Sequence, residues 1–261
     1  MNGGVDSLTL ESVMDLARVT GEVAMRHFRT RVRVETKSDG SPVSDADRAA
    51  ERAAREWVDI RFPDDGVLGE EYGELRPGAA RRWIVDPIDG TKAFVRDVPL
   101  WGSLVALCEG SHVLAGSAFF PAIDEIIAAA PGQGCWWNGV KASVSRTRGI
   151  DEATVLTTDC GFAGDRVRQH GWEALASRAQ LSRTWGDCYG YLLVATGRAD
   201  VMLDPVLAPW DAAALYPIIR EAGGVFTDWD GEDTAFGGSA IATNRALASA
   251  VRSLLSTPDR G

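Results

Sequence analysis

Two carboxylates lie three residues apart in the segment Asp86–Thr91, whose sequence is DPIDGT. The apolar run before it predicts a β-strand that ends at Asp86, and Pro87 forces an extended turn. Carboxylates at such a turn can converge on a hard cation, which prefers oxygen ligands. The helix start expected at Gly90 and Thr91 offers backbone N–H groups to a phosphate. An Asx turn followed by a helix cap would explain the same residues without a metal.

Two further acidic features bear on this choice. Glu70 and Glu71 follow a short strand expected at residues 67–69, where adjacent carboxylates repel each other unless solvent or a cation relieves them. A solvated loop is the ordinary explanation. Asp211 lies in the first turn of a helix predicted from Trp210 to Ala222, where it would stabilise the helix dipole without a metal. Each feature has a structural explanation of its own, but their combination favours a cation site.

The elements that must position these acids follow from hydrophobic periodicity. Helices are predicted over about residues 10–28, with Thr9 as the cap, and from Ser44 to just before Pro63. Short apolar runs between residues 102 and 139 predict an antiparallel meander. Beyond residue 155, helices (166–179, 187–196, 210–222, and from Asn244) alternate with strands (201–203, 225–226, 240–242). This order predicts a layered α/β protein with mixed sheets.

Composition excludes several classes of protein. The 261 residues are 45% hydrophobic and 25% charged, as in ordinary globular proteins, and no apolar run approaches the ~18 residues of a membrane span. A net charge of −10 disfavours nucleic-acid binding but permits action on phosphates where metal ions reverse the local sign. Four dispersed cysteines argue against a zinc ribbon or a disulfide framework. Met1–Asp6 lacks the features of a signal peptide, so we expect a cytoplasmic protein.

In this order, Glu70-Glu71, the Asp86–Thr91 segment and Trp210-Asp211 resemble the inositol monophosphatase family of magnesium-dependent phosphatases. The resemblance covers nearly the whole chain, as far as residues 238–244. It implies an αβαβα sandwich with two mixed sheets. Residues 1–261 would form a single catalytic unit, with an N-terminal α+β lobe over about residues 1–145 and a C-terminal α/β lobe over about residues 146–261. Ala93 stands where the family commonly has Asn, outside the expected ligand set.

The resemblance also implies the metal ligands. One magnesium ion would be held by Glu70, Asp86 and the carbonyl of Ile88. A second would be held by Asp86, Asp89 and Asp211, and manganese could substitute for magnesium. Two such ions stabilise the attacking and leaving oxygens of an in-line displacement.

Four further roles are implied around these ions. Thr91, paired with Asp47, would accept the proton of the attacking water. Glu71 would orient this water and share a third, weaker magnesium site. Backbone N–H groups of Gly90 and Thr91 would bind the phosphate. An ordinary acid in the first turn of a helix is the alternative for Asp47.

The substrate must be selected by residues over the leaving group, because phosphatases for inositol phosphate, fructose bisphosphate, histidinol phosphate and phosphoadenosine phosphate share these motifs. Asp187 and Asp204 are candidates to bind the ammonium and imidazole groups of histidinol. Arg183 could face the substrate or the phosphate, and a helix N-cap is the alternative for Asp187. The run Gly186–Tyr191 (GDCYGY), with residues 90–92 and 98–104, looks most like the branch of the family that hydrolyses histidinol phosphate.

We therefore predict a magnesium-dependent phosphate monoester hydrolase that acts on histidinol phosphate in histidine biosynthesis. It would bind neither nucleic acid nor membrane, and the family suggests a homodimer. Inositol-1-monophosphatase and fructose-1,6-bisphosphatase are the alternatives within the family. A metal-binding relative without catalysis is the non-enzymatic alternative, which the intact set of acids and Thr91 disfavours because decay normally removes one of them.

Overall fold

The computed structural model describes residues 7–30, 33–36 and 42–256, so the expectation based on Met1–Asp6 lies outside the described residues. The helices are α1 (Ser7–Met25), α2 (Asp45–Arg61), α3 (Thr91–Phe94), α4 (Arg166–Ala176), α5 (Asp187–Ala195), α6 (Pro209–Glu221) and α7 (Ala248–Leu255), with 3-10 turns at Ile150–Glu152 and Phe162–Gly164. Two predicted helix starts were wrong. Thr9 lies inside α1 and is not its cap. Asn244 lies in a turn before α7, where its Oδ1 accepts the N–H of Leu247 at 2.9 Å.

The described strands form two large sheets and one short hairpin. The hairpin consists of β1 (Val34–Thr36) and β2 (Pro42–Ser44). The first large sheet contains β3 (Gly66–Gly69), β4 (Gly73–Leu75), β5 (Arg81–Asp89), β6 (Gly102–Glu109), β7 (His112–Phe120), β8 (Glu125–Ala130), β9 (Gly134–Trp137) and β10 (Val140–Lys141). The second contains β11 (Thr154–Thr157), β12 (Leu181–Arg183), β13 (Val201–Asp204), β14 (Val225–Thr227) and β15 (Ala240–Thr243).

The larger sheet has the strand order β10-β9-β8-β7-β6-β5-β3-β4. All neighbours from β5 to β10 are antiparallel, which confirms the predicted meander. The pair β3 and β5 is parallel, with Gly69 opposite Val85. The carboxyl ends of parallel strands meet at one edge of a sheet. The residues that follow this pair, Glu70 and Asp86, therefore emerge at the same edge.

The smaller sheet has the strand order β12-β11-β13-β15-β14. Strands β12, β11 and β13 are parallel, whereas β15 is antiparallel to both of its neighbours. Its two faces alternate along each strand: Val155 and Val201 face one hydrophobic cluster, and Leu156 and Met202 face another. The sheet is thus covered on both sides. Both sheets are mixed, as predicted.

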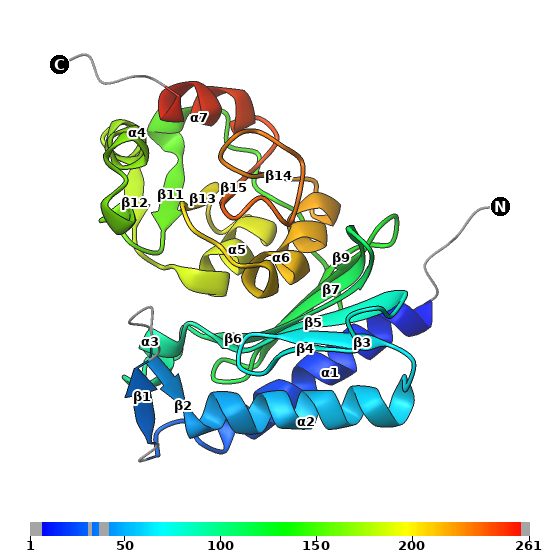
Figure 1. The fold of residues 1–261 in the computed structure, drawn as a ribbon. Helices are drawn as coiled ribbons and strands as arrows, with labels where there is room; N and C mark the ends of the chain where they lie inside the picture. The colour runs from blue at the N-terminus through cyan, green and yellow to red at the C-terminus, as the bar shows by residue number, and fades with distance from the viewer. Residues whose placement is uncertain (1–6, 31–32, 37–41, 257–261) are drawn as a thin grey trace.

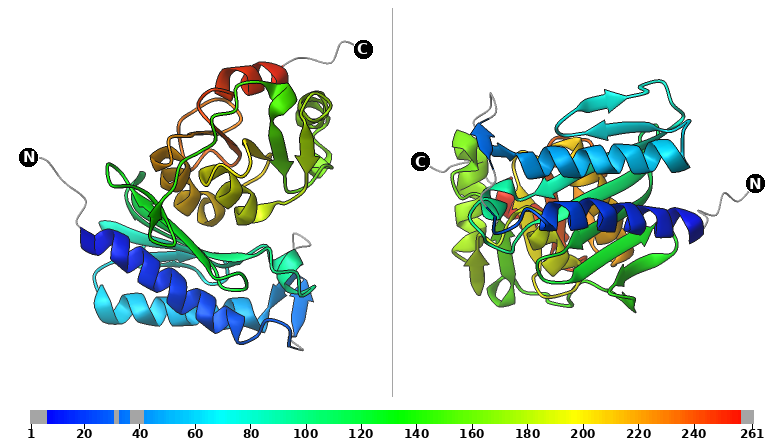
Figure 2. Two further views of the ribbon diagram at one scale, coloured as in Figure 1. Left: turned by 180° about the vertical axis from the view of Figure 1, so that it is seen from behind. Right: turned by 90° about the horizontal axis from the view of Figure 1, so that it is seen from below.

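The layers stack in the order α1 and α2, the larger sheet, α5 and α6, the smaller sheet, and α4 with α7 (Figure 1). Helices α1 and α2 lie side by side across one face of the larger sheet, as the view from below in Figure 2 shows. Helices α5 and α6 lie between the two sheets (Figure 1). The αβαβα arrangement confirms the predicted fold class.

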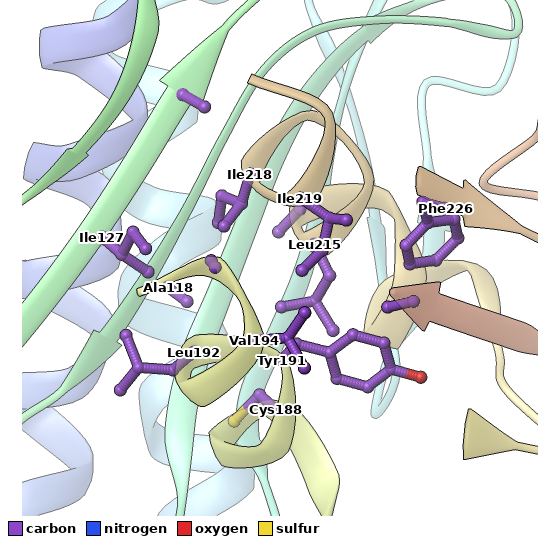
Figure 3. Close-up of a cluster of buried hydrophobic side chains, with 14 of the residues drawn as sticks. Ala118, Ile127, Cys188, Tyr191, Leu192, Val194, Leu215, Ile218, Ile219 and Phe226 are labelled. Carbon is purple, nitrogen blue, oxygen red and sulfur yellow. The ribbon is translucent and has the colours of Figure 1, made fainter. Parts of the chain in front are cut away.

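The middle layer is anchored by apolar side chains. Figure 3 shows Leu215, Ile218 and Ile219 of α6 and Tyr191, Leu192 and Val194 of α5, packed among residues of β7, β8 and β14. Removing side chains of this size from water stabilises a fold by about 1.5–3 kcal/mol each. This packing fixes the two helices whose first turns carry the acids Asp187 and Asp211.

Candidate active site

Three carboxylates converge where β5 ends and α6 begins. Asp86, Asp89 and Asp211 each place an oxygen within 4.8 Å of the others, and among the described residues these three form the group suited to hold a metal ion. The larger sheet supplies the first two and the middle helical layer supplies the third. Carboxylate oxygens at this spacing fit a hard divalent cation such as Mg²⁺.

Electrostatics show why this group needs a cation. Burial raises the pKa of Asp86 and Asp89 well above the ordinary value. The charges of Glu70 and the other two carboxylates raise the pKa of Asp86 further, and that of Asp211 is raised to about 6. Buried carboxylates that repel each other take up protons unless positive charge offsets them. A divalent ion would supply that charge.

The Asx turn and the helix cap, which would explain these acids without a metal, are both present. The N–H of Ile88 donates to Asp86 Oδ1 at 2.9 Å in an Asx-type contact. The N–H of Ala208 donates to Asp211 Oδ2 at 2.8 Å and so satisfies the backbone at the start of α6. Each hydrogen bond engages one oxygen of its carboxylate. The same contacts that cap the local backbone therefore orient the acids toward one another.

Thr91 lies between the carboxylate of Asp47 and the backbone of β5. Its hydroxyl donates to the carbonyl of Ile88 at 3.0 Å and lies 3.4 Å from Asp47 Oδ1. The other oxygen of Asp47 accepts the N–H and the hydroxyl of Ser44, at 2.8 and 2.6 Å. Asp47 is therefore both an ordinary acid in the first turn of α2 and the partner expected for Thr91. Burial raises its pKa, and the nearby charge of Glu70 adds to this effect.

A cavity of about 260 Å³ opens over the carboxylates. Most of the predicted site residues line it: Glu70, Asp86, Ile88, Asp89, Gly90, Thr91, Asp187 and Asp211. Gly90 has φ +87°, and a Cβ there would lie 2.9 Å from the carbonyl oxygen of Leu100, so only glycine fits this turn. Lys92 also lines the cavity and was not selected from the sequence. Its place directly after Thr91 was the signal available.

Asp187 and Asp204 line a smaller cavity of about 100 Å³, and the acids Asp89, Asp187 and Asp211 line both this cavity and the larger one. Asp187 has φ +51°, and its N–H donates to the hydroxyl oxygen of Thr158 at 2.8 Å. Gly186 is the N-cap of α5 and no side chain caps the helix, so the N-cap explanation of Asp187 was wrong. Asp204 is buried and accepts the hydroxyl of Tyr191 at 2.8 Å.

Two predicted residues lie elsewhere. Arg183 is exposed on β12, donates to the carbonyl of Ser182, and lines a separate cavity with Cys160 and Trp172, so the structure does not bring it to the carboxylates. Glu71 does not line the cavity over the acids, and its N–H donates to the carboxylate of Glu51 at 2.7 Å. The sequence did not single out Glu51, because the pattern of an amphipathic helix does not indicate which distant residues a glutamate on it contacts.

Comparison with known proteins agrees with this geometry. Residues 7–257 match the inositol monophosphatase family, and the chain belongs to this family of metal-dependent phosphatases. The histidinol-phosphatase of Chlorobaculum parvum is 41% identical over 241 residues, which cover 91% of this chain and 93% of that protein. The histidinol-phosphatase of Mycobacterium tuberculosis is 41% identical over 222 residues, 83% of this chain and 85% of that protein.

A solved structure shows the same fold. The extragenic suppressor protein suhB of Bartonella henselae superimposes with a TM-score of 0.91 at 27% identity, covering 97% of this chain and all of that one. The family predicted from the acidic motifs is thereby confirmed. The roles of the individual site residues stay predictions.

Proposed function

We propose that this chain is a magnesium-dependent hydrolase of phosphate monoesters whose substrate is histidinol phosphate. The observation that carries the proposal is the convergence of Asp86, Asp89 and Asp211 beneath a cavity lined by Gly90 and Thr91. The 41% identity to two proteins named histidinol-phosphatase supports this choice of substrate over inositol phosphate or fructose bisphosphate.

The acids divide into two ligand sets in this proposal. Glu70, Asp86 and the carbonyl of Ile88 would hold one magnesium ion, and Asp86, Asp89 and Asp211 would hold a second. Glu71 would contribute to a third, weaker site. Manganese can take the place of magnesium. Magnesium ions held there would polarise the phosphate and lower the pKa of the attacking water.

The chain's own residues then move the proton and hold the phosphate. The Thr91 hydroxyl takes the proton of the attacking water and passes its own to Asp47, whose Oδ1 lies 3.4 Å away. Backbone N–H groups of Gly90 and Thr91 bind the phosphate oxygens. The ammonium of Lys92, which lines the same cavity, offsets further negative charge of the phosphate.

Asp187 and Asp204 bind the leaving group in this proposal. Both line the smaller cavity, and Asp187 also lines the larger one, so a substrate can reach from the metal ligands into this space. Carboxylates pair with the ammonium and imidazole of histidinol, whereas a polyol needs mixed donors and acceptors. Arg183 has no part here, because its cavity contains none of the clustered carboxylates.

A panel of phosphate monoesters tests the proposal. Phosphate release would be measured with magnesium on histidinol phosphate, inositol-1-phosphate and fructose-1,6-bisphosphate side by side. We expect the highest kcat/KM on histidinol phosphate. A preference for inositol-1-phosphate would reassign the chain to the polyol phosphatases, and release from none of the esters would favour the metal-binding protein without catalysis.

We also propose that the two sheets belong to lobes of one catalytic unit, that the protein is a homodimer, and that it works in the cytoplasm. No helix within the described residues is long and apolar enough to cross a membrane. All four cysteines are free, which suits a reducing compartment. Light scattering coupled to gel filtration measures the oligomeric state directly.

A further inference from the structure

Glu51 is a buried carboxylate outside the metal-ligand set. It lies on α2, one helical turn after Asp47, and is 0% exposed. Its Oε1 accepts from Arg55, with Nε at 2.8 Å and Nη2 at 2.7 Å, and from the N–H of Tyr72 at 3.2 Å. Its Oε2 accepts the N–H of Glu71 at 2.7 Å. The carboxylate therefore connects α2 to the turn between β3 and β4.

Arg55, the charged partner of Glu51, contacts the same turn. A buried charge is strongly unfavourable unless it is paired and hydrogen-bonded, and Arg55 supplies the opposite charge. The guanidinium of Arg55 also donates to the carbonyl of Gly73 at 2.6 Å. The ion pair is thus hydrogen-bonded to the backbone of residues 71, 72 and 73, immediately after Glu70. Helix α2 packs against β3 in the region where this turn lies (Figure 1).

Gly69 shows how closely the turn approaches the carboxylate. A Cβ added at Gly69 would lie 2.1 Å from Glu51 Oε1, far inside contact distance. The backbone before Glu70 and the carboxylate therefore occupy adjoining positions with no space for a methyl group. A glycine at this point lets the strand end rest directly on the ion pair.

We propose that Glu51 is a positioning residue, which holds the Glu70–Glu71 turn against α2 and so sets the metal ligand Glu70 at a fixed distance from Asp47. The inference rests on the metal assignment of the proposed function. Helix α2 carries both Asp47 and Glu51, so a single rigid element holds the acid that faces Thr91 and also contacts the glutamate turn. Residues that orient metal ligands in this way change metal affinity by about 10- to 100-fold when they are altered.

Manganese binding to the substrate-free protein tests this inference. Free Mn²⁺ would be counted by electron paramagnetic resonance during titration of wild type, Glu51→Gln and Gly69→Ala. Glutamine keeps the shape but points an NH₂ group at backbone or guanidinium donors, and alanine at position 69 forces the turn and the Glu51 carboxylate apart without changing any charge. The controls are Glu56→Gln, an exposed glutamate on the same helix, and Gly78→Ala, where a Cβ meets nothing within 4 Å.

We expect both test variants to bind Mn²⁺ about 10- to 100-fold more weakly than their controls, with higher Mg²⁺ concentrations restoring much of the lost phosphate release. Gly69→Ala decides the matter if Glu51→Gln does not fold. Wild-type affinity in the folded test variants would overturn this inference alone. A wild-type protein that binds no Mn²⁺ would instead overturn the metal assignment itself.

Discussion

The hydroxyl of Tyr191 donates a 2.8 Å hydrogen bond to Asp204 Oδ2 between α5 and β13, where both side chains are buried. Burial raises the pKa of Asp204 to about 7, although hydrogen bonds from Thr158 and Tyr191 oppose the shift. The folded protein therefore keeps a proton that the unfolded chain releases near the ordinary pKa of about 4. Below pH 4, Asp204 is protonated in both states and does not lower the free energy of unfolding. As the pH rises from 4 to 7, Asp204 lowers this free energy progressively, and above pH 7 the reduction stays constant.

Replacing Asp204 with Asn removes this pH dependence. Between pH 5 and pH 8, the free energy of unfolding of Asp204→Asn should rise relative to wild type by roughly 2–3 kcal/mol, because only wild type must bury the charge. Urea unfolding at both pH values, with a chelator present, measures the difference. Parallel pH profiles of the two proteins would contradict the assignment of this titration to Asp204.

Asp89→Asn should uncouple stability from activity. Without metal at pH 8, the variant should be more stable than wild type, because one of the repelling buried charges is gone. Magnesium should raise the melting temperature of wild type but not of the variant, since a ligand that binds the native state stabilises it. Turnover of Asp89→Asn should fall by several orders of magnitude, and chelator should abolish phosphate release in wild type.

Asp211→Asn provides a second test of the same expectation, by thermal melts and phosphate assays. Near-normal activity in either variant would exclude the two-metal arrangement.

Thr91→Ala should separate proton transfer from metal binding. The hydroxyl contacts Asp47 and the Ile88 carbonyl, so its loss should lower kcat by about 10²–10⁴. Thr91→Ser keeps the hydroxyl and should retain most of the rate. Magnesium affinity, measured by calorimetry, should change little. A collapse of metal affinity would make Thr91 a structural residue or a ligand.

Asp187→Asn should change the choice of substrate. Asparagine tolerates the left-handed backbone at this position, so the substitution removes charge and leaves the turn intact. Transition-state stabilisation for histidinol phosphate should fall by about 1.5–3 kcal/mol, the range for a charge-assisted hydrogen bond. Hydrolysis of inositol-1-phosphate should fall far less. The ratio of kcat/KM values on the two esters measures this, for Asp204→Asn as well, and equal losses would assign the carboxylates no part in selectivity.

Much of the fold and of the acidic cluster could be predicted from local pattern. Apolar runs such as Trp83–Val85 predict a strand, and this places Asp86 on it correctly. The predicted strand end at Asp86 was wrong, because β5 continues through Pro87 to Asp89, with a shift in its pairing to β6 between Asp86 and Asp89. The strands of the meander could be predicted in the same way, because each is an apolar run bounded by turn residues. Helix ends were less accurate, because Asn244 can cap a turn as readily as it can begin a helix.

Contacts between distant segments could not be predicted. The sequence does not reveal that Glu51 reaches the turn after β3, or that Tyr191 pairs with Asp204, because these partners are joined only by the packing of α2 and α5. Arg183, two residues before Trp185, was a candidate to face the substrate or the phosphate, but it lies on β12 at the edge of the smaller sheet and lines another cavity. Sequence proximity is a poor guide where a strand ends and the chain turns.

The N–H of Cys188 donates to Asp89 Oδ2 and thereby joins the start of α5 to the end of β5, across 99 positions of the chain. The acids converge only after both sheets and the helices between them have assembled. Contacts between such distant positions form slowly, since chain entropy must be lost before they stabilise the fold. We expect the ability to capture Mn²⁺ to appear as a late event during refolding, after helical circular dichroism has recovered. A time course of both signals would make the ion a reporter of completed folding.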